Sequence, residues 1–215
     1  RNAFRIAIYG RVLFYHIIML KEKLKERHII LASGSPRRQQ FFRDLGLDFE
    51  VRLKDTKEDY PNRLMHFEIS DYLAQLKSLP FLYDLKDHEI LVTSDTIVWH
   101  KGVALGKPRN NDEAFAMLKS LSDNTHEVIT SVCVRTKIFQ KTVNATTKVT
   151  FKAFTDEEIW HYIKTYSPLD KAGAYGIQEW IGQIGVTSIE GSFFNVVGMP
   201  THLVYKTLNT IAEEF

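Results

Sequence analysis

The stretch Glu89–Trp99, EILVTSDTIVW, is the strongest strand signal in the chain, and the fold can be worked out from it. It is an apolar run interrupted by the polar segment from Thr93 to Thr96, which contains Asp95. Because a buried carboxylate without a partner is costly, we expect Asp95 to have a partner or to face a cleft. In a functional role Asp95 would be a metal ligand or a general base. Otherwise it is an aspartate at a strand end or turn.

Upstream of this strand, the sequence predicts a unit of strand, loop and helix. His28–Ala32, HIILA, is a short apolar run typical of a buried strand. It stops at a polar segment in which Ser35 suits a helix N-cap and Pro36 suits the first helical position. The predicted helix ends at Gly46, a residue that favours the conformation needed after a helix C-terminus.

The other elements are predicted from periodicity and capping signals. We expect strands at Phe49–Leu53, Glu127–Lys137, Asn144–Phe154 and Phe193–Val197. We expect helices at Phe67–Leu79, Asn110–Leu121, Thr155–Tyr166 and from Pro200 to about Glu213, and a long glycine-rich loop from Ser167 to about Glu190. Strands alternate with helices and one hairpin stands apart. This order predicts an α/β fold with a mixed, partly antiparallel, twisted sheet flanked by helices.

The composition is ordinary for a globular protein, with 44% hydrophobic and 25% charged residues in a chain of 215 residues. A net charge of +2 is too small to argue for general nucleic-acid binding, so any positive charge that matters must be local. Cys133 is the single cysteine, so no intrachain disulfide can form. Its apolar neighbours predict a buried strand residue, which is compatible with the reducing cytoplasm that we expect for this protein.

The first residues of the chain differ in character from the rest. Val12–Leu20 is apolar but is interrupted by His16 and is too short to span a bilayer. No small-residue cleavage site of a signal peptide follows it. We therefore expect residues 1–20 to be an extension outside the folded domain, with the natural start at Met19, and residues 21–215 to form a single domain.

The segment SGSPRR (33–38) lies between the first strand and a helix N-terminus, where free backbone N–H groups and the helix dipole favour an anion. Gly34 lets the backbone approach such an anion closely. Further donors come from Ser33, Ser35, Arg37 and Arg38. The segment therefore predicts a phosphate site, and the alternative is a capped helix with two solvated arginines. It is not a P-loop, because the spaced Gly-Lys-Ser/Thr pattern is absent.

Other candidates are weaker when they are taken alone. Lys107, between Gly and Pro, could meet a phosphate or lie in a surface turn. In the loop DKAGAYGIQ (170–178), small residues permit contact with a flat ligand and Gln178 could read the edge of a base; the alternative is a flexible loop. By themselves, Glu58 fits a solvated charge cluster and Lys77 fits a surface lysine. The histidines show no paired spacing, which argues against a zinc site.

Taken together, these segments resemble the Maf family of nucleotide pyrophosphatases, also known from septum formation. The matching segments are SGSPRR (33–38), SDTIV (94–98), GKP (106–108), DKAGAYGIQ (170–178) and GSFFNVVGMP (191–200), in the order of the family. The resemblance runs from about His28 to the C-terminus. It implies two lobes with a central cleft, and hydrolysis between the α and β phosphates of a nucleoside triphosphate with a divalent metal.

The resemblance also implies roles for individual residues. Asp95 falls on the proton-acceptor position, Arg37, Thr96 and Gln178 on specificity positions, and Glu58, Lys77 and Lys107 on polar positions of the site. The sub-group with Arg38, Thr96 and Gln178 at these places prefers dTTP and UTP, whereas a sub-group acting on 7-methyl-GTP differs there. Two departures stand out: Thr56 and Lys57 dilute an acidic cluster around Glu58, and Glu179–Gly182 is bulky where many relatives are glycine-rich.

We therefore expect a nucleoside triphosphate pyrophosphatase that acts on dTTP and UTP, modified pyrimidine triphosphates included. The expected catalytic residues are Asp95, Glu58 and Lys77, and the expected substrate-binding residues are Ser33, Ser35, Arg37, Arg38, Thr96, Lys107, Lys171 and Gln178. Mg²⁺ or Mn²⁺ held by Asp95 and Glu58 would activate a water that attacks the α-phosphorus, and base and ligand roles compete for Asp95.

Two alternatives stay open from the sequence. One is a nucleotide- or nucleic-acid-binding regulator of cell division with little catalysis, and the other is an enzyme that removes non-canonical purine triphosphates. We expect no membrane and no stable nucleic acid as partners. A homodimer through the closing helix is left open.

Overall fold

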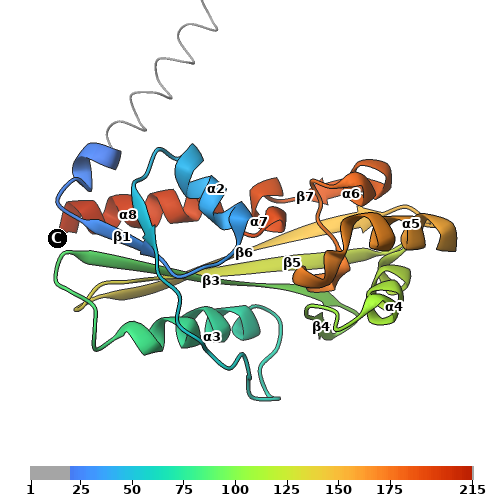
Figure 1. Ribbon diagram of the computed structural model, residues 1–215, viewed down its shortest axis with the longest axis horizontal. Helices are drawn as coiled ribbons and strands as arrows, with labels where there is room; N and C mark the ends of the chain where they lie inside the picture. The colour runs from blue at the N-terminus through green and yellow to red at the C-terminus, as the bar shows by residue number, and fades with distance from the viewer. Residues whose placement is uncertain (1–19, 215) are drawn as a thin grey trace, which may run out of the picture.

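The computed structural model describes residues 20–214, so the expectations about the start at Met19 and the preceding extension lie outside the described residues. A seven-stranded sheet with the order β2-β1-β3-β5-β6-β7, and β4 beside β3, forms the centre of the molecule (Figure 1). The strands are β1 (His28–Leu31), β2 (Phe49–Val51), β3 (Glu89–His100), β4 (Val103–Leu105), β5 (Thr125–Arg135), β6 (Gln140–Phe151) and β7 (Val186–Glu190). Because β1 pairs parallel with β2 and β3 and the other pairs are antiparallel, the predicted mixed sheet is confirmed.

The helices α2 (Pro36–Asp44), α4 (Asn111–Leu121) and α5 (Asp156–Tyr166) begin where the capping signals place them. Further helices are α3 (Phe67–Ser78), α6 (Trp180–Gly185), α7 (Phe193–Val197) and α8 (Thr201–Glu214), with 3-10 turns η1 (Leu79–Phe81), η2 (Pro168–Asp170) and η3 (Ala172–Ala174). Asn110 accepts a hydrogen bond from the backbone N–H of Glu113, and Thr155 and Glu158 form a capping box. None of the helices within residues 20–214 combines the length and the apolar character that crossing a membrane requires.

The long strand β3 has an open stretch of edge that decides where a site can form. Its pairing with β1 ends at Val92, and its pairing with β4 begins at Val98. On its other side, β3 pairs with β5 without interruption through this region. The polar residues that interrupt the apolar run therefore lie in the middle of a strand and not at its end, with one edge free of a neighbouring strand.

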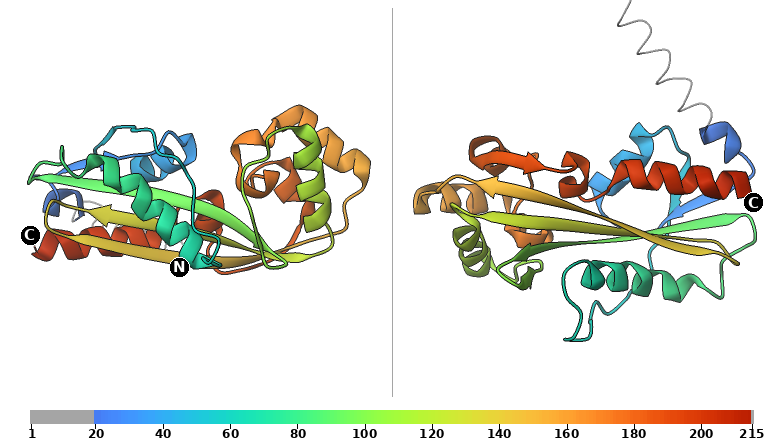
Figure 2. Two further views of the ribbon diagram at one scale, coloured as in Figure 1. Left: turned by 90° about the horizontal axis from the view of Figure 1, so that it is seen from below. Right: turned by 180° about the vertical axis from the view of Figure 1, so that it is seen from behind.

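Two main cores lie at opposite ends of the long strands (Figure 2). At the end that holds β1, α2 and α8 cover one face of the sheet through Phe42, Val204 and Leu208, and α3 covers the other face (Figure 1). At the far end, α4, α5 and α6 pack together through Leu118, Ile159 and Ile181. This arrangement gives the two lobes that the sequence resemblance implied.

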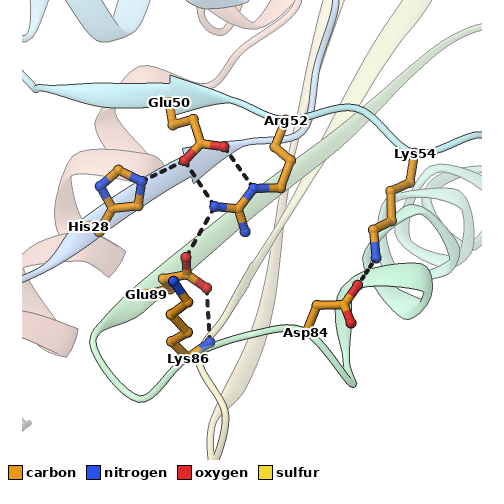
Figure 3. Close-up of polar contacts among 7 residues, drawn as sticks. All are labelled: His28, Glu50, Arg52, Lys54, Asp84, Lys86 and Glu89. Atoms are coloured by element: carbon orange, nitrogen blue, oxygen red, sulfur yellow. Dashed lines mark hydrogen bonds and ion pairs between the residues drawn. The ribbon is translucent and has the colours of Figure 1, made fainter.

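A charged network ties β2 and β1 to the beginning of β3 (Figure 3). The buried carboxylate of Glu89 accepts hydrogen bonds from the backbone N–H of Lys86 at 2.8 Å and from Arg52 Nη2 at 3.1 Å. Arg52 Nε donates to Glu50 Oε1 at 2.7 Å, and His28 Nε2 lies 2.8 Å from Glu50 Oε2. Hydrogen bonds from Arg52 and His28 lower the pKa of Glu50 to about 2. The network links β1, β2 and the start of β3 next to the segment SGSPRR (33–38), which follows β1.

Two sequence predictions are wrong. The expected loop from Ser167 to Glu190 contains η2, η3, α6 and β7, and the expected strand Phe193–Val197 is the helix α7. The Ser192 hydroxyl caps α7 by accepting from the backbone N–H of Asn195, and the buried Asn195 amide donates to Val128 O at 2.9 Å. β7, rather than residues 193–197, takes the place beside β6.

Candidate active site

Asp95 lies at the open edge of β3, with its side chain directed toward α3. Thr93 Oγ1, two residues earlier on the same side of the strand, donates to Ala74 O at 2.6 Å. Asp95 Oδ1 lies 2.6 Å from Lys77 Nζ, and Asp95 is 6% exposed. The predicted partner for a buried carboxylate is therefore present. The alternative of a strand-end or turn aspartate is wrong.

The ammonium of Lys77 lies between two carboxylates. Besides Asp95, it contacts Glu58 Oε1 at 3.1 Å. Glu58 comes from the coil between β2 and α3, and its side chain is 47% exposed, whereas that of Lys77 is 18% exposed. Lys77 is therefore a cleft residue and not the surface lysine that its position at the end of a helical face suggested.

Arg38 joins three segments that are far apart in the sequence. Its Nε donates to Gly198 O at 3.0 Å, its Nη1 to Ser94 O at 2.9 Å, and its Nη2 to Thr96 Oγ1 at 3.0 Å. Ser94 O is a backbone acceptor on the stretch of β3 whose edge is open. Much of the donor capacity of Arg38 is thus used within the protein to hold β3 against α2 and the end of α7.

The Thr96 hydroxyl continues this chain of hydrogen bonds into the sheet. Thr96 Oγ1 and Thr130 Oγ1 are 2.9 Å apart, and the two residues are direct cross-strand partners in β3 and β5. Thr130 Oγ1 donates to Asn195 O at 3.0 Å. Because a hydroxyl has one proton to donate, Thr96 must donate to Thr130 and accept from Arg38.

A second charged group lines the opposite wall of the cleft. Arg37 Nη1 lies 3.3 Å from Asp170 Oδ2, and Lys171 Nζ lies 2.6 Å from Asp170 Oδ1. Burial raises the pKa of Asp170, but Lys171 and Arg37 outweigh that effect, and the net pKa lies below its usual value. Lys171 is buried, so the wall presents a fixed charge pattern to the cleft.

The structure brings all the sequence-predicted site residues to two adjoining hollows that share Ser35, Arg37, Arg38, Lys77 and Lys107. The first hollow is also lined by Asp95, Thr96, Lys171 and Gln178, and the second by Ser33 and Glu58. Sequence reasoning assigned no role to Asp170, Thr130 or Asn195. Asp170 directly precedes Lys171 in a motif and could have been found there, whereas Thr130 lies in an ordinary apolar strand.

The acidic groups of the cleft fit a divalent cation that is completed by a phosphate ligand. Within residues 20–214, no cluster of three or more histidine, cysteine, aspartate or glutamate side chains could hold a metal ion. Asp95 and Glu58 nevertheless converge on one cation, the Lys77 ammonium. Mg²⁺ is commonly held by one or two carboxylates together with substrate phosphates, and these two side chains supply such a set.

Comparison with known proteins places the chain in a family. A family model described as Maf-like protein matches residues 28–211. A dTTP/UTP pyrophosphatase of Flavobacterium johnsoniae is 61% identical over 193 residues, which cover 90% of this chain and 100% of the relative. A dTTP/UTP pyrophosphatase of Flavobacterium psychrophilum is 58% identical over 190 residues, covering 88% of this chain and 97% of the relative. Among solved structures, the Staphylococcus aureus Ham1 protein aligns with a TM-score of 0.47 and 16% identity over 86% of this chain and 100% of that chain. With its motifs in one cleft and the family model matching most of its length, the chain belongs to the Maf family.

Proposed function

We propose that the protein hydrolyses dTTP and UTP to the nucleoside monophosphate and pyrophosphate. The observation that carries the proposal is one cleft in which a buried carboxylate, Asp95, faces Lys77 and lies beside the arginines of the SGSPRR segment. The names of relatives that are 61% and 58% identical support the choice of substrates.

The phosphates are assigned to the basic side of the cleft. Arg37, Lys107 and Lys171 line it, and the N-terminus of α2 adds backbone N–H groups near Ser33 and Ser35. Arg38 donates to two backbone carbonyls and to Thr96, so its main role in this proposal is to shape the site. Direct phosphate contact by Arg38 is secondary.

The chemical step is assigned to Asp95 and its neighbours. Mg²⁺ or Mn²⁺, held by Asp95 and Glu58, would neutralise phosphate charge and lower the pKa of the attacking water. Without a metal, Lys77 Nζ engages Asp95 Oδ1; a metal shared by Asp95 and Glu58 would take the place of the ammonium, which would then turn to the phosphate. The other oxygen, Oδ2, takes the proton of the water, and Lys77 lies close enough to compensate charge on the phosphate.

The nucleobase of the substrate is assigned to the far side of the cleft, where Gln178 lies exposed at the rim. The amide of a glutamine can donate to one group and accept from another on the edge of a pyrimidine. The hydroxyl of Thr96 is engaged by Arg38 and Thr130, so this residue influences substrate choice through the position of Arg38. A cytoplasmic location and a homodimer stay predictions.

The test is release of pyrophosphate from dTTP, UTP, CTP, ITP and 7-methyl-GTP, each with Mg²⁺ or Mn²⁺. We expect dTTP and UTP to be the best substrates. Asp95→Asn should lower turnover by a factor on the order of 10²–10⁴ while the protein still folds, which a cooperative thermal unfolding transition checks. Asp112→Asn, at an exposed position of α4, serves as the matched control and should keep full activity.

Three outcomes would contradict the proposal. Release from none of the five nucleotides would favour a binding regulator, and release from ITP alone would favour an enzyme for non-canonical purine nucleotides. Near-normal turnover by Asp95→Asn would remove Asp95 from the chemical step.

A further inference from the structure

Glu179 is a charged residue next to Gln178 for which the proposed function has no role, and it contacts Lys171 of the cleft wall. It is the residue before α6, and both of its carboxylate oxygens are engaged. Oε1 lies 3.3 Å from Lys171 Nζ, and Oε2 accepts a hydrogen bond from the hydroxyl of Tyr162 in α5. Lys171 and Glu179 stand near opposite ends of the loop that bears Gln178, so their contact closes the loop on itself.

Tyr162 holds this arrangement from the core. Its side chain is fully buried, and its hydroxyl also accepts from the backbone N–H of Gly176 at 3.0 Å. Burial, followed by the hydrogen bond to Glu179, raises the pKa of Tyr162, so the phenol keeps its proton and donates it to the carboxylate. One phenol thus fixes both the middle of the loop, at Gly176, and its end, at Glu179.

The carboxylate of Glu179 lies beside the amide of Gln178. A Cβ atom placed on Gly176 would stand 3.0 Å from Gln178 Nε2 and 3.0 Å from Glu179 Oε2, so both side chains lie over the same face of Gly176. The negative charge of the carboxylate favours the NH₂ end of the amide on its side over the carbonyl oxygen. The position of Gln178 Nε2 on the face of Gly176 that also holds Glu179 Oε2 fits this preference.

This preference matters because the two ends of a glutamine amide have nearly the same shape. Uracil and thymine present an N–H donor at position 3 and a carbonyl acceptor at position 4, whereas cytosine presents an acceptor and an amino donor at these places. A freely turning amide could match either pattern by exchanging its oxygen and nitrogen ends. Discrimination between the two kinds of base requires that the amide be held in one orientation.

A contribution to stability does not by itself explain why Tyr162, Lys171 and Glu179 are placed together. Burying the Lys171 ammonium against carboxylates carries a desolvation cost, and buried ion pairs often add little to stability compared with apolar side chains of similar size. The better-attested role of buried ion pairs is to select one conformation of the surrounding residues among several.

We propose that Glu179, held by Tyr162 and Lys171, is a positioning residue that fixes the Gln178 amide and so makes the cleft select uracil and thymine nucleotides over cytosine nucleotides. The inference rests on the proposed function, since it assigns the base to the Gln178 side of the cleft.

The test compares UTP with CTP in the wild-type protein and in Glu179→Gln, which keeps the size of the side chain and removes its charge. We expect the ratio of kcat/KM for UTP to that for CTP to fall about tenfold, because a well-oriented bidentate contact is worth about that factor or more. Part of the change should be a rise in kcat/KM for CTP, which a merely damaged site would not give. Tyr162→Phe, which keeps the packed ring, should shift the ratio in the same direction.

The matched control is Glu157→Gln, an exposed glutamate of α5, which should keep the wild-type ratio. Thermal unfolding of each variant checks that it is folded. A folded Glu179→Gln or Tyr162→Phe protein with the wild-type ratio would overturn the inference.

Binding of the non-hydrolysable α,β-methylene analogues of UTP and CTP, followed by calorimetry, separates this inference from the proposed function. A wild-type protein that prefers the UTP analogue but does not cleave UTP would refute the proposed function. The affinity ratio in Glu179→Gln would then decide the inference. Equal affinity of the wild-type protein for both analogues would overturn the inference even if both nucleotides are cleaved.

Discussion

The Lys77 ammonium lies where a divalent cation shared by Asp95 and Glu58 would lie. Its Nζ is 2.6 Å from Asp95 Oδ1 and 3.1 Å from Glu58 Oε1, distances at which a second cation is excluded unless the lysine moves. In the proposed metal site, binding of the ion would therefore be coupled to the contacts of Lys77. A nucleotide that brings phosphate oxygens into the cleft offers the displaced ammonium a new anionic partner.

A first prediction concerns this exchange. Lys77→Met removes the competing charge but keeps the apolar stem, so the variant should bind Mn²⁺ without nucleotide at least about tenfold more tightly than the wild-type protein. Electron paramagnetic resonance of free Mn²⁺ measures the affinity directly. Lys107→Met is the control, because Lys107 lines the same cleft but is not placed between the carboxylates. Unchanged Mn²⁺ affinity in Lys77→Met would show that the two carboxylates do not form the metal site.

The individual site residues differ in how far the sequence could predict them. The cost of a lone buried carboxylate was enough to predict that Asp95 has a partner or faces a cleft. The identity of that partner depends on how α3 packs against β3, which no local pattern states, so Lys77 looked like a surface residue. Its place in the site was expected only from the resemblance to a family, and the same holds for Glu58.

Among the elements, the short helix α7 has a large effect on the shape of the cleft, because it links the sheet to Arg38. The side-chain amide of Asn195 donates to Val128 O at 2.9 Å and to Thr147 Oγ1 at 3.0 Å, and the backbone carbonyl oxygen of Asn195 accepts from Thr130 Oγ1. Gly198, which ends the helix, gives its carbonyl oxygen to Arg38. The position of α7 is thus transmitted to the wall of the cleft.

A second prediction concerns this helix. Asn195→Leu should destabilise the protein by about 2–4 kcal/mol, because the Val128 carbonyl loses its side-chain donor in a buried place and the Thr147 hydroxyl keeps only the N–H of Ser192. Urea unfolding followed by tryptophan fluorescence measures the loss. Phe193→Ala on the same helix should cost less than half as much, since Phe193 is 42% exposed. Equal losses in both variants would mean that apolar burial, and not the amide, holds α7.

The helices α2 and α5 were predicted from their caps, whereas α7 was taken for a strand although the Ser192 hydroxyl caps it. The N-caps Ser35 and Thr155 bond to backbone N–H groups only three residues further along the chain, so the sequence alone shows them. The run Phe193–Val197 is short and apolar, so it fits a strand or a helix equally well. The helix also brings the Asn195 amide to Val128 O, a hydrogen-bond partner 67 residues away in the sequence that no local pattern shows.

At the scale of the whole molecule, three long antiparallel strands carry two cores and leave the cleft between them. Alternation of strands and helices was enough to predict the mixed sheet, but not where β1 stops along β3. The open edge arises because β1 is only 4 residues long whereas β3 has 12. The far core contains His126, which is buried against Phe151 and lies 2.7 Å from the Tyr175 hydroxyl at the cleft.

The state of His126 makes the stability of the whole molecule depend on pH. Burial, with a smaller effect of His100, lowers the pKa of His126 to about 3, whereas an unfolded histidine has a pKa near 6.5. The unfolded chain therefore binds a proton below pH 6.5 that the folded protein does not bind until about pH 3. Its stabilising contribution is complete above pH 6.5 and is lost progressively as the pH falls toward 3.

The third prediction follows from this loss of stability as the pH falls. Below pH 6.5, the free energy of unfolding should fall with a slope that approaches about 1.4 kcal/mol per pH unit for His126 alone as the pH nears 5, with a further loss from His100, whose pKa is also lowered. His126→Phe fills the site with an apolar ring and should flatten the dependence by that amount, even if it is less stable at pH 7.5. His161→Gln, an exposed histidine of α5, should keep the wild-type slope. Urea unfolding at pH 7.5, 6.5, 5.5 and 5.0 measures all three proteins, and a wild-type slope in His126→Phe would show that His126 is already protonated in the folded molecule.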